Sequence, residues 1–241
     1  MRSLNLIAAG CVVYVVVAGC QKFDIKYRDA AKNCRITSYA GKSFDNNVIH
    51  RVFHYNEFGN PTLVEYPETG GGTGTPNFIF TYNDRQQLKK LVGWATHNFT
   101  YNKEGRVIID SLVGDYAGQD SRYEERYFYD VYGRVIKVVS KFYYDRDDSP
   151  DVGTVTTNNY KYDMHGNLIV PGVTYDTKKS IYRTHPLWMF LNRNYSLNNA
   201  IPADSYNSSG LPTGWSSNSV DFLQSSILLE EVEYDCGGNN K

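Results

Sequence analysis

Aromatic and polar residues alternate in short segments along this chain, and each segment ends in residues that favour a tight turn. In one of them, Phe53 and Tyr55 stand two apart, and Asn56 and Gly59 follow. Residues two apart on a β-strand share a face. Asn favours the first position of a type I turn and Gly the fourth. The segment therefore predicts a β-hairpin that sends a pair of aromatic rings to one side.

This turn motif recurs as a tyrosine, then Asn or Asp, and then Gly four places after the tyrosine. The complete copies hold Tyr55 and Gly59, Tyr101 and Gly105, Tyr129 and Gly133, Tyr162 and Gly166, and Tyr206 and Gly210. A further copy at Tyr82 carries Gln86 in place of the glycine. Every copy has an apolar residue six places after its tyrosine, which suits the returning strand of a hairpin. Each copy therefore predicts a strand, a turn and a strand.

The repeat predicts an all-β fold, an antiparallel meander of hairpins that forms a curved sheet around an aromatic core. Polar residues such as Thr81 and Thr100 lie between the aromatic positions, so one face is buried and the other is in water. We interpret the tyrosines as rings stacked across strands with their hydroxyls at the rim. The alternative is an aromatic binding face. On the first interpretation, function lies away from these tyrosines.

The regular repeat ends after Tyr175. Residues 185–191 are strongly apolar, with Pro186 near the start and no β-branched residue, and this predicts a short helix. We expect the helix to pack on the aromatic face as a lid, with closing strands over 220–234. Two segments predict long loops. They are residues 69–76, with four glycines, and the acidic residues 145–153.

The tyrosine motifs resemble the YD repeats of the Rhs and teneurin class, and more closely those of small YD-repeat lipoproteins of Bacteroidetes. Residues 194–199, the copy at Tyr206 and the sequence Tyr234-Asp235-Cys236 are similar to the C-terminal signature of that group. The resemblance covers roughly residues 35–236 and implies the hairpin architecture without a defined activity. Six copies are too few to enclose a toxin, and the aspartate–proline motif of Rhs self-cleavage is missing.

The N-terminus predicts export. A short basic start precedes an apolar run over residues 4–17, which is short for a membrane span. Val17-Ala18-Gly19-Cys20 resembles a bacterial lipobox, which implies that residues 1–19 are cleaved and that Cys20 is lipidated. Residues 20–33 would then form a tether, and the acyl chains would hold the protein on a membrane surface. The alternative is an ordinary signal peptide with an incidental cysteine.

Sorting rules of other lipoproteins, applied to Gln21 and Lys22, favour the outer membrane. We interpret residues 34–241 as one β domain, since β architectures of this size are commonly single domains. Cys34 and Cys236 lie near its two ends. An exported location permits a disulfide between them, and the alternative is two buried thiols.

Charge and motifs argue against several function classes. The chain has 25 Lys and Arg against 26 Asp and Glu. Removal of residues 1–19 would also remove one basic residue, Arg2, so the mature chain would be slightly more acidic. A nucleic-acid partner would demand a basic stripe. Adjacent carboxylates such as Glu124 and Glu125 point to opposite faces of a strand, which does not suit paired acid–base chemistry. We find no nucleophile elbow, phosphate loop or metalloprotease motif, and predict no cofactor.

Two candidate ligand sites remain. Trp94, Trp188 and Trp215 are candidate aromatics for a glycan, although the segment around Trp188 also suits a core helix. The acidic loop offers carboxylates for calcium at Asp145, Asp147, Asp148 and Asp151. It lacks the glycine and the distal glutamate of an EF-hand, and the alternative is a solvated hairpin tip.

The sequence predicts a non-catalytic, lipid-anchored cell-envelope protein that acts as a structural or interaction module. Its partners would be the membrane and either a glycan or another envelope protein. A surface glycan-binding lipoprotein is the alternative, and a hydrolase whose site is not visible in the sequence is a third. A pocket that holds two carboxylates, or a histidine and a carboxylate, on neighbouring strands would favour the hydrolase.

Overall fold

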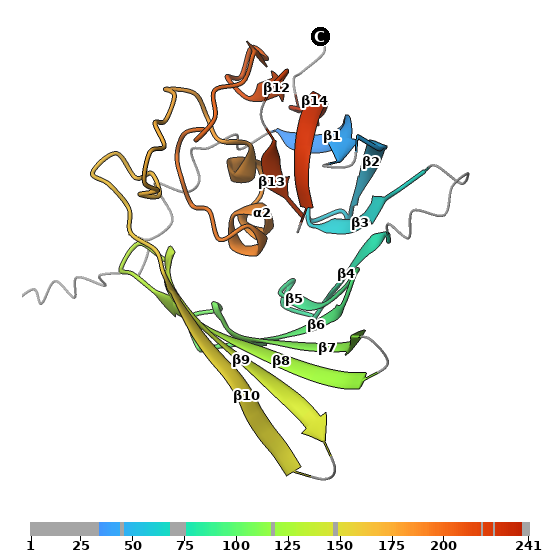
Figure 1. Cartoon of the computed structure of the whole chain (residues 1–241). Coiled ribbons are helices and arrows are strands. Elements are labelled where there is room, and N and C mark those ends of the chain that lie inside the picture. Colours follow the sequence, from blue (N-terminus) through green and yellow to red (C-terminus); the bar gives the residue numbers. More distant parts are fainter. Residues whose placement is uncertain are drawn as a thin grey trace, which may run out of the picture.

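The computed structural model describes residues 34–43, 46–67, 76–116, 119–146, 149–217, 219–223 and 225–237. Within them, twelve strands form one antiparallel sheet (Figure 1). They are β1 (Arg35–Ser43), β2 (Val48–Tyr55), β3 (Pro61–Glu65), β4 (Phe78–Tyr82), β5 (Leu88–Val92), β6 (Thr96–Tyr101), β7 (Val107–Tyr116), β8 (Gln119–Tyr129), β9 (Val135–Arg146), β10 (Ser149–Asn159), β13 (Val220–Phe222) and β14 (Ser225–Asp235). Strands β1 to β10 are neighbours in chain order, and β14 returns beside β1. The predicted all-β meander is confirmed.

The repeat turns have the predicted geometry. In the first copy, the Gly59 amide donates to the Asn56 carbonyl and the Asn56 amide donates to the Asn60 carbonyl, both at 2.9 Å. The Asn56 side-chain oxygen also accepts from the amides of Phe58 and Asn60. Gly59 has a φ of 81°, and Gln86 adopts 58° at the same place in the copy without glycine. The left-handed conformation explains why glycine recurs there.

The tyrosine of each copy pairs with the apolar residue six places later. These pairs are Tyr55 with Pro61, Tyr82 with Leu88, Tyr101 with Val107, Tyr129 with Val135, Tyr162 with Leu168, and Tyr206 with Pro212. The last of them joins β11 (Ser205–Tyr206) to β12 (Pro212–Gly214) in a separate two-stranded sheet. The aromatic residues two places before the tyrosines on β2, β4, β6 and β8 are buried. The predicted strand–turn–strand units are therefore confirmed in five copies, while the copy at Tyr162 has its turn and a single bridge to Leu168.

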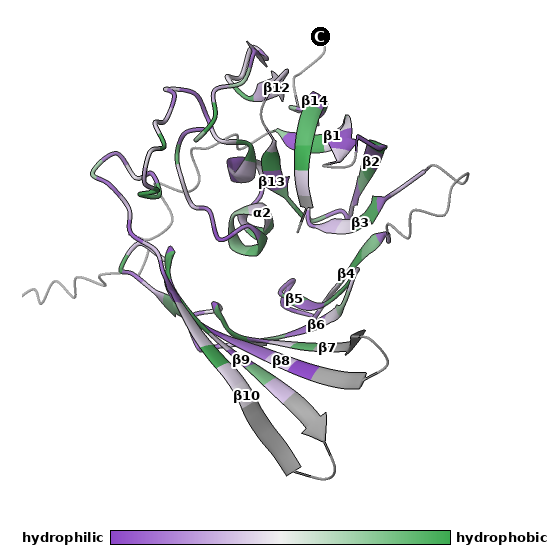
Figure 2. Cartoon of the chain, in the orientation of Figure 1, coloured by the Kyte–Doolittle hydropathy of each residue, from purple (hydrophilic) through white to green (hydrophobic). Residues whose placement is uncertain are grey.

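The sheet curves around α2 (Pro186–Leu191), which follows the short 3-10 helix η1 (Ile181–Thr184) (Figure 1). Trp188 of α2 is fully buried, and its ring centroid lies 5.6 Å from Phe53, 5.9 Å from Phe80 and 5.7 Å from Phe222. Figure 2 shows α2 as a mostly hydrophobic helix inside the curve. The predicted helical lid is thus a central part of the core.

The tyrosine hydroxyls connect successive hairpins. Tyr82 donates to the Pro61 carbonyl at 2.7 Å, and the copies at Tyr101, Tyr129 and Tyr162 repeat this contact with the hairpin before them. The hydroxyl of Tyr206 donates to the Asp176 carboxylate instead. The further donor–acceptor pairs are Tyr101 with Leu88, Tyr129 with Val107, Tyr162 with Val135, Tyr175 with Leu168, and Tyr234 with Pro212. Tyr55 makes the same kind of bond to Ile36 on β1. We call these seven tyrosines the tyrosine ladder. Each acceptor other than Ile36 is the apolar residue six places after the previous motif tyrosine.

The predicted acidic loop over 145–153 is wrong in extent. Strand β9 continues to Arg146 and β10 begins at Ser149, with Asp145 opposite Pro150 and Asp151 opposite Tyr144. Proline is tolerated because β10 is an edge strand of the sheet. Valines and threonines after Asp151 have a high preference for strands, so the hairpin outweighs the loop signals of the acidic residues. Most of the glycine-rich segment 69–76 lies outside the described residues.

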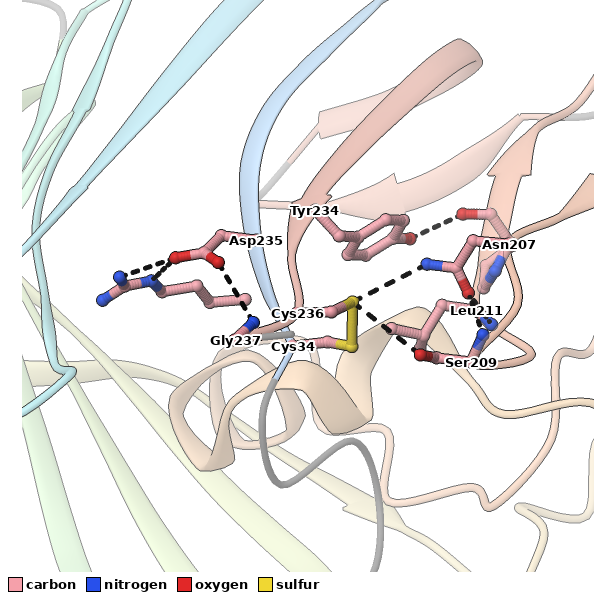
Figure 3. The surroundings of a disulfide bond; sticks show 10 residues. Cys34, Asn207, Ser209, Leu211, Tyr234, Asp235, Cys236 and Gly237 are labelled. Atoms are coloured by element: carbon pink, nitrogen blue, oxygen red, sulfur yellow. Dashed lines mark hydrogen bonds and ion pairs between the residues drawn. A yellow bond between two sulfur atoms is a disulfide. The ribbon is translucent and has the colours of Figure 1, made fainter. Parts of the chain in front are cut away.

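The two ends of the domain are joined. Strand β14 pairs with β1, with Arg35 opposite Asp235, and their side chains form an ion pair at 2.7 Å. Next to this pair, Cys34 and Cys236 form a disulfide that links residues 202 positions apart (Figure 3). The buried side chain of Leu211 packs beside it. Of the two alternatives for these cysteines, the structure therefore has the disulfide. In the described part of the chain, no helix is long and apolar enough to cross a membrane.

The tyrosine ladder predicts a cost for removing one hydroxyl. We expect Tyr101→Phe to lower the free energy of unfolding by about 1 kcal/mol, because the Leu88 carbonyl loses its donor while the ring still packs. Urea denaturation measures this difference. Tyr132→Phe is the control, because this ring is 55 % exposed at a turn. A loss equal to that of the control would show that the hydroxyl does not contribute.

Candidate functional site

An open groove runs along the row of repeat turns. It consists of two adjoining cavities of about 490 Å³ and 220 Å³, which share Tyr132 and Tyr195. One wall is formed by ladder tyrosines and by turn residues of successive copies, and the other by α2 and the segment after it. The larger cavity contacts Tyr82, Tyr101 and Tyr129 on the first wall and His185, Pro186, Met189 and Phe190 on the second. We call this the turn groove.

The backbone of the turns that border the groove is already hydrogen-bonded. The Asn102 amide pairs with the Arg106 carbonyl, and the Asp130 amide pairs with the Arg134 carbonyl. A ligand would therefore meet side chains. Amides near one end are provided by Asn60, Gln86 and Gln87, and the Asn60 side chain donates to Gln86 at 3.3 Å.

Three arginines and one carboxylate are among the residues that line the groove. Arg106 lines the larger cavity and lies 5.6 Å from the centre of the Tyr129 ring. Arg134 and Arg183 line the smaller one together with the carboxylate Asp163, but Arg134 forms an ion pair with Asp130 at 2.7 Å and Arg183 is buried. The Asp163 side chain accepts turn amides at 2.8 and 2.9 Å, so part of its charge is already compensated.

His185 combines a structural role with a place in the groove wall. Its Nδ1 accepts the Leu187 amide at 3.1 Å, which caps the N-terminus of α2. An accepting nitrogen must carry no proton, and desolvation lowers the pKa of His185 from 6.5 to about 4. The imidazole is thus neutral at physiological pH.

A second polar cluster lies inside the sheet, away from the groove. Asp110 on β7 stands directly opposite Glu125 on β8, and both are buried. The Asp110 carboxylate is 2.9 Å from His97 Nδ1, while Glu125 accepts from Tyr127 and from Arg193, which follows α2. Burial raises the pKa of Asp110. The cluster holds the segment after α2 against the sheet.

This cluster bears on the predicted arrangement of carboxylates. The adjacent carboxylates Glu124 and Glu125 are separated, as predicted. Glu124 binds Arg126 at 2.8 Å, while Glu125 faces the interior. The carboxylate that lies next to Glu125 in space is Asp110 on the neighbouring strand. This pairing depends on strand register and not on a sequence motif. Two carboxylates and a histidine therefore meet on neighbouring strands. The turn groove is lined by other residues, and both carboxylates of the cluster are buried.

The predicted tryptophan site does not assemble. Trp188 is fully buried and Trp215 is 3 % exposed, with its indole N–H donating to the Ile201 carbonyl. Both are core residues, because large rings at the centre of a curved sheet bury the most apolar surface. Trp94, which lies between β5 and β6, is 56 % exposed. Trp188 and Trp215 are therefore wrong as exposed ligand aromatics, and Trp94 stays a candidate.

Several predicted positions fall outside what the structure describes. Cys20, the N-terminal segment 1–33, Asp147 and Asp148 lie outside the described residues, and Asp145 and Asp151 are placed only by their backbone. Among the described side chains, no three His, Cys, Asp or Glu residues come together as a metal site. The calcium hypothesis stays a prediction.

The turn groove was missed by the sequence analysis, which sought function away from the tyrosines. The repeat predicts each turn, but the groove depends on how the segment 181–195 lies along the row of turns. One signal in the sequence was present. Residues 185–191 stand out in the sequence as an apolar segment, and five of the seven line the larger cavity, with Trp188 and Leu191 the exceptions.

Comparison with known proteins adds no assignment. No protein-family model matches the chain, and none of the curated proteins is significantly similar to it. The resemblance to YD-repeat lipoproteins therefore stays a prediction.

The neutral cap at His185 predicts a loss of stability in acid. Between pH 6.5 and about 4 the unfolded chain takes up a proton that folded His185 does not, so stability falls as pH falls. We expect His185 to contribute a loss on the order of 2–3 kcal/mol by about pH 4.5. His185→Asn keeps a capping oxygen without a titrating group, and should lose that much less stability than the wild type. Urea denaturation of both proteins, above pH 6.5 and at about pH 4.5, tests this. Equal losses in the two proteins would contradict it.

Proposed function

We propose that the protein is a lipid-anchored cell-envelope module that binds a partner and does not catalyse a reaction. The turn groove carries this proposal. It is open, preformed by the repeat architecture, and large enough for part of a ligand. Its aromatic, amide and arginine side chains are typical of recognition rather than of bond breaking.

The charged groups argue for binding over hydrolysis. Among the residues that line the groove, Asp163 is the only carboxylate, and it is engaged in its own turn. General acid–base hydrolysis needs two such groups at the reacting bond. The carboxylates that do meet, Asp110 and Glu125, are 4 % and 3 % exposed. Both contact His97 or Arg193 in place of a substrate.

The anchor part of the proposal is supported by the lipobox-like sequence before Cys20. The first described residue, Cys34, is tied to Cys236 by the disulfide. A pull on the chain at residue 34 would therefore be carried by a covalent link to β14 as well as by β1. Such a link suits a domain that is attached to a membrane through its N-terminal side.

The lipid anchor has a direct test. We expect Cys20→Ala to abolish incorporation of an alkyne-labelled fatty acid and to release the protein from the membrane fraction, because the acylated thiol is gone. Cys11→Ala is the matched control, since Cys11 lies in the apolar run before the lipobox. It should keep both the label and the membrane association. Labelled Cys20→Ala protein, or an unchanged membrane fraction, would refute the anchor.

A further inference from the structure

We propose that two copies of this protein join along β10, which pairs antiparallel with β10 of the second copy. The inference goes beyond the proposed function, and it depends neither on the turn groove nor on the lipid anchor. It concerns residues 154–159, where β10 forms one end of the twelve-stranded sheet.

The last hydrogen bond between β10 and β9 shows which way the backbone of β10 is turned. The Tyr160 amide donates to the Ile136 carbonyl at 2.8 Å. Asn159 lies opposite Lys137, so the same register places Tyr160 directly opposite Ile136. Hydrogen-bonded and non-hydrogen-bonded residues alternate along an antiparallel pair. Tyr160 is therefore a hydrogen-bonded position, and Asn159 turns its amide and carbonyl away from β9.

The same alternation continues back along the strand. The register has no shift between Thr154 and Asn159, so Val155 and Thr157 face outward in the same way as Asn159. The sheet places β9 on one side of β10 and ends on the other. Within the described residues, no strand therefore pairs with these three outward amides and carbonyls.

This edge lacks the devices that usually prevent strand pairing, which are charged side chains, prolines, bulges and short length. Pro150 and the register shift between Val152 and Thr154 affect the start of β10 alone. Residues 154–159 carry no charge and are all exposed. The strand at the other end of the sheet, β13, has three residues. Of the two edges, β10 is thus the long and unprotected one.

The side chains of this edge favour a second copy over a foreign peptide. A strand that adds to a sheet obtains affinity from its backbone and specificity from pockets for its side chains. Residues 154–159 lie on an open surface, and the cavities of the turn groove are lined by other residues. An identical strand needs no such pocket. Its valine and threonines suit a strand, and two uncharged edges meet without like-charge repulsion.

One register uses every outward group of residues 154–159. When a two-fold axis passes through Thr157, this residue lies opposite its own copy, and Val155 lies opposite Asn159 of the second copy. Each outward residue then bonds through both its amide and its carbonyl. Such an interface is closed, so it produces a dimer rather than a fibre. Figure 1 shows β10 as the outermost strand of the extended hairpins.

The mass of the full-length protein tests the proposal. In excess detergent at micromolar concentration, we expect twice the mass of one chain, measured by light scattering with absorbance and refractive index to subtract the detergent. Thr157→Pro removes an outward amide and should give a monomer, because proline at this position spares the bonds to β9. Thr157→Val keeps the amide and should remain a dimer. Circular dichroism verifies that both variants are folded.

Cysteines on β10 test the register, on the purified protein and in intact cells. Thr157→Cys should form an intermolecular disulfide under mild oxidation, because directly opposed Cα atoms in a hydrogen-bonded pair lie about 5.5 Å apart. Val155→Cys is the matched control on the same face of the same strand. Its two copies would be four residues apart along the seam, or about 13 Å, which is too far for a disulfide. Non-reducing gels measure the linked dimer.

A monomeric wild type, or a dimer that persists in Thr157→Pro, would overturn the proposal. Linking of neither cysteine variant, equal linking of both, or linking of Val155→Cys alone would overturn it as well. If Thr157→Cys links to a different envelope protein in cells, the edge serves a foreign partner and the proposal fails. None of these results affects the anchor, which is measured by the fatty-acid label on Cys20.

Discussion

The hydrogen bond from a tyrosine hydroxyl to a carbonyl of the preceding hairpin keeps the repeats of this protein in line. Its donor is the motif tyrosine, and its acceptor is the residue six places after the tyrosine of the previous copy. The bond therefore fixes the turn ends of neighbouring hairpins and leaves their far ends free. From Tyr55 to Tyr162, the spacing between successive motif tyrosines ranges from 19 residues (Tyr82 to Tyr101) to 33 residues (Tyr129 to Tyr162). The extra residues lengthen strands β7 to β10, which extend away from the core (Figure 1).

The same alignment produces the turn groove. Because the ladder holds the turns in one row, residues at equal places in different copies form a continuous wall. Arg106 and Arg134 each stand directly after the turn glycine of their copies, and both face rings of motif tyrosines. The opposite wall depends on α2, which is fixed by Trp188 in the core and by the Arg193–Glu125 ion pair at its far end. A repeated local code and one irregular segment thus build the site together.

The sequence predicted the parts of the fold that local chemistry decides. Asn56 and Gly59 specify a turn through backbone geometry alone, and alternation specifies the buried face, so the hairpins could be predicted. The prediction failed at residues 145–153. We gave the acidic side chains and Pro150 more weight as loop signals than the strand preference of their neighbours. The groove and the Asp110–Glu125 pairing were not accessible, because they depend on the path of residues 181–195 and on register between hairpins. The ladder could have been anticipated from a buried hydroxyl's need for an acceptor.

Alkaline titration of the tyrosines, followed by ultraviolet absorbance, tests the ladder most directly. An ordinary tyrosine ionises near pH 10. Burial raises the pKa of Tyr101 to about 12 and the pKa values of Tyr55, Tyr82 and Tyr129 further, which preserves the protons that they donate. The account predicts two phases, with the second occurring as the β-sheet circular dichroism is lost, and with a smaller second phase when Tyr82, Tyr101 and Tyr129 are replaced by phenylalanine. Ionisation of all tyrosines near pH 10, with the sheet intact, would contradict it.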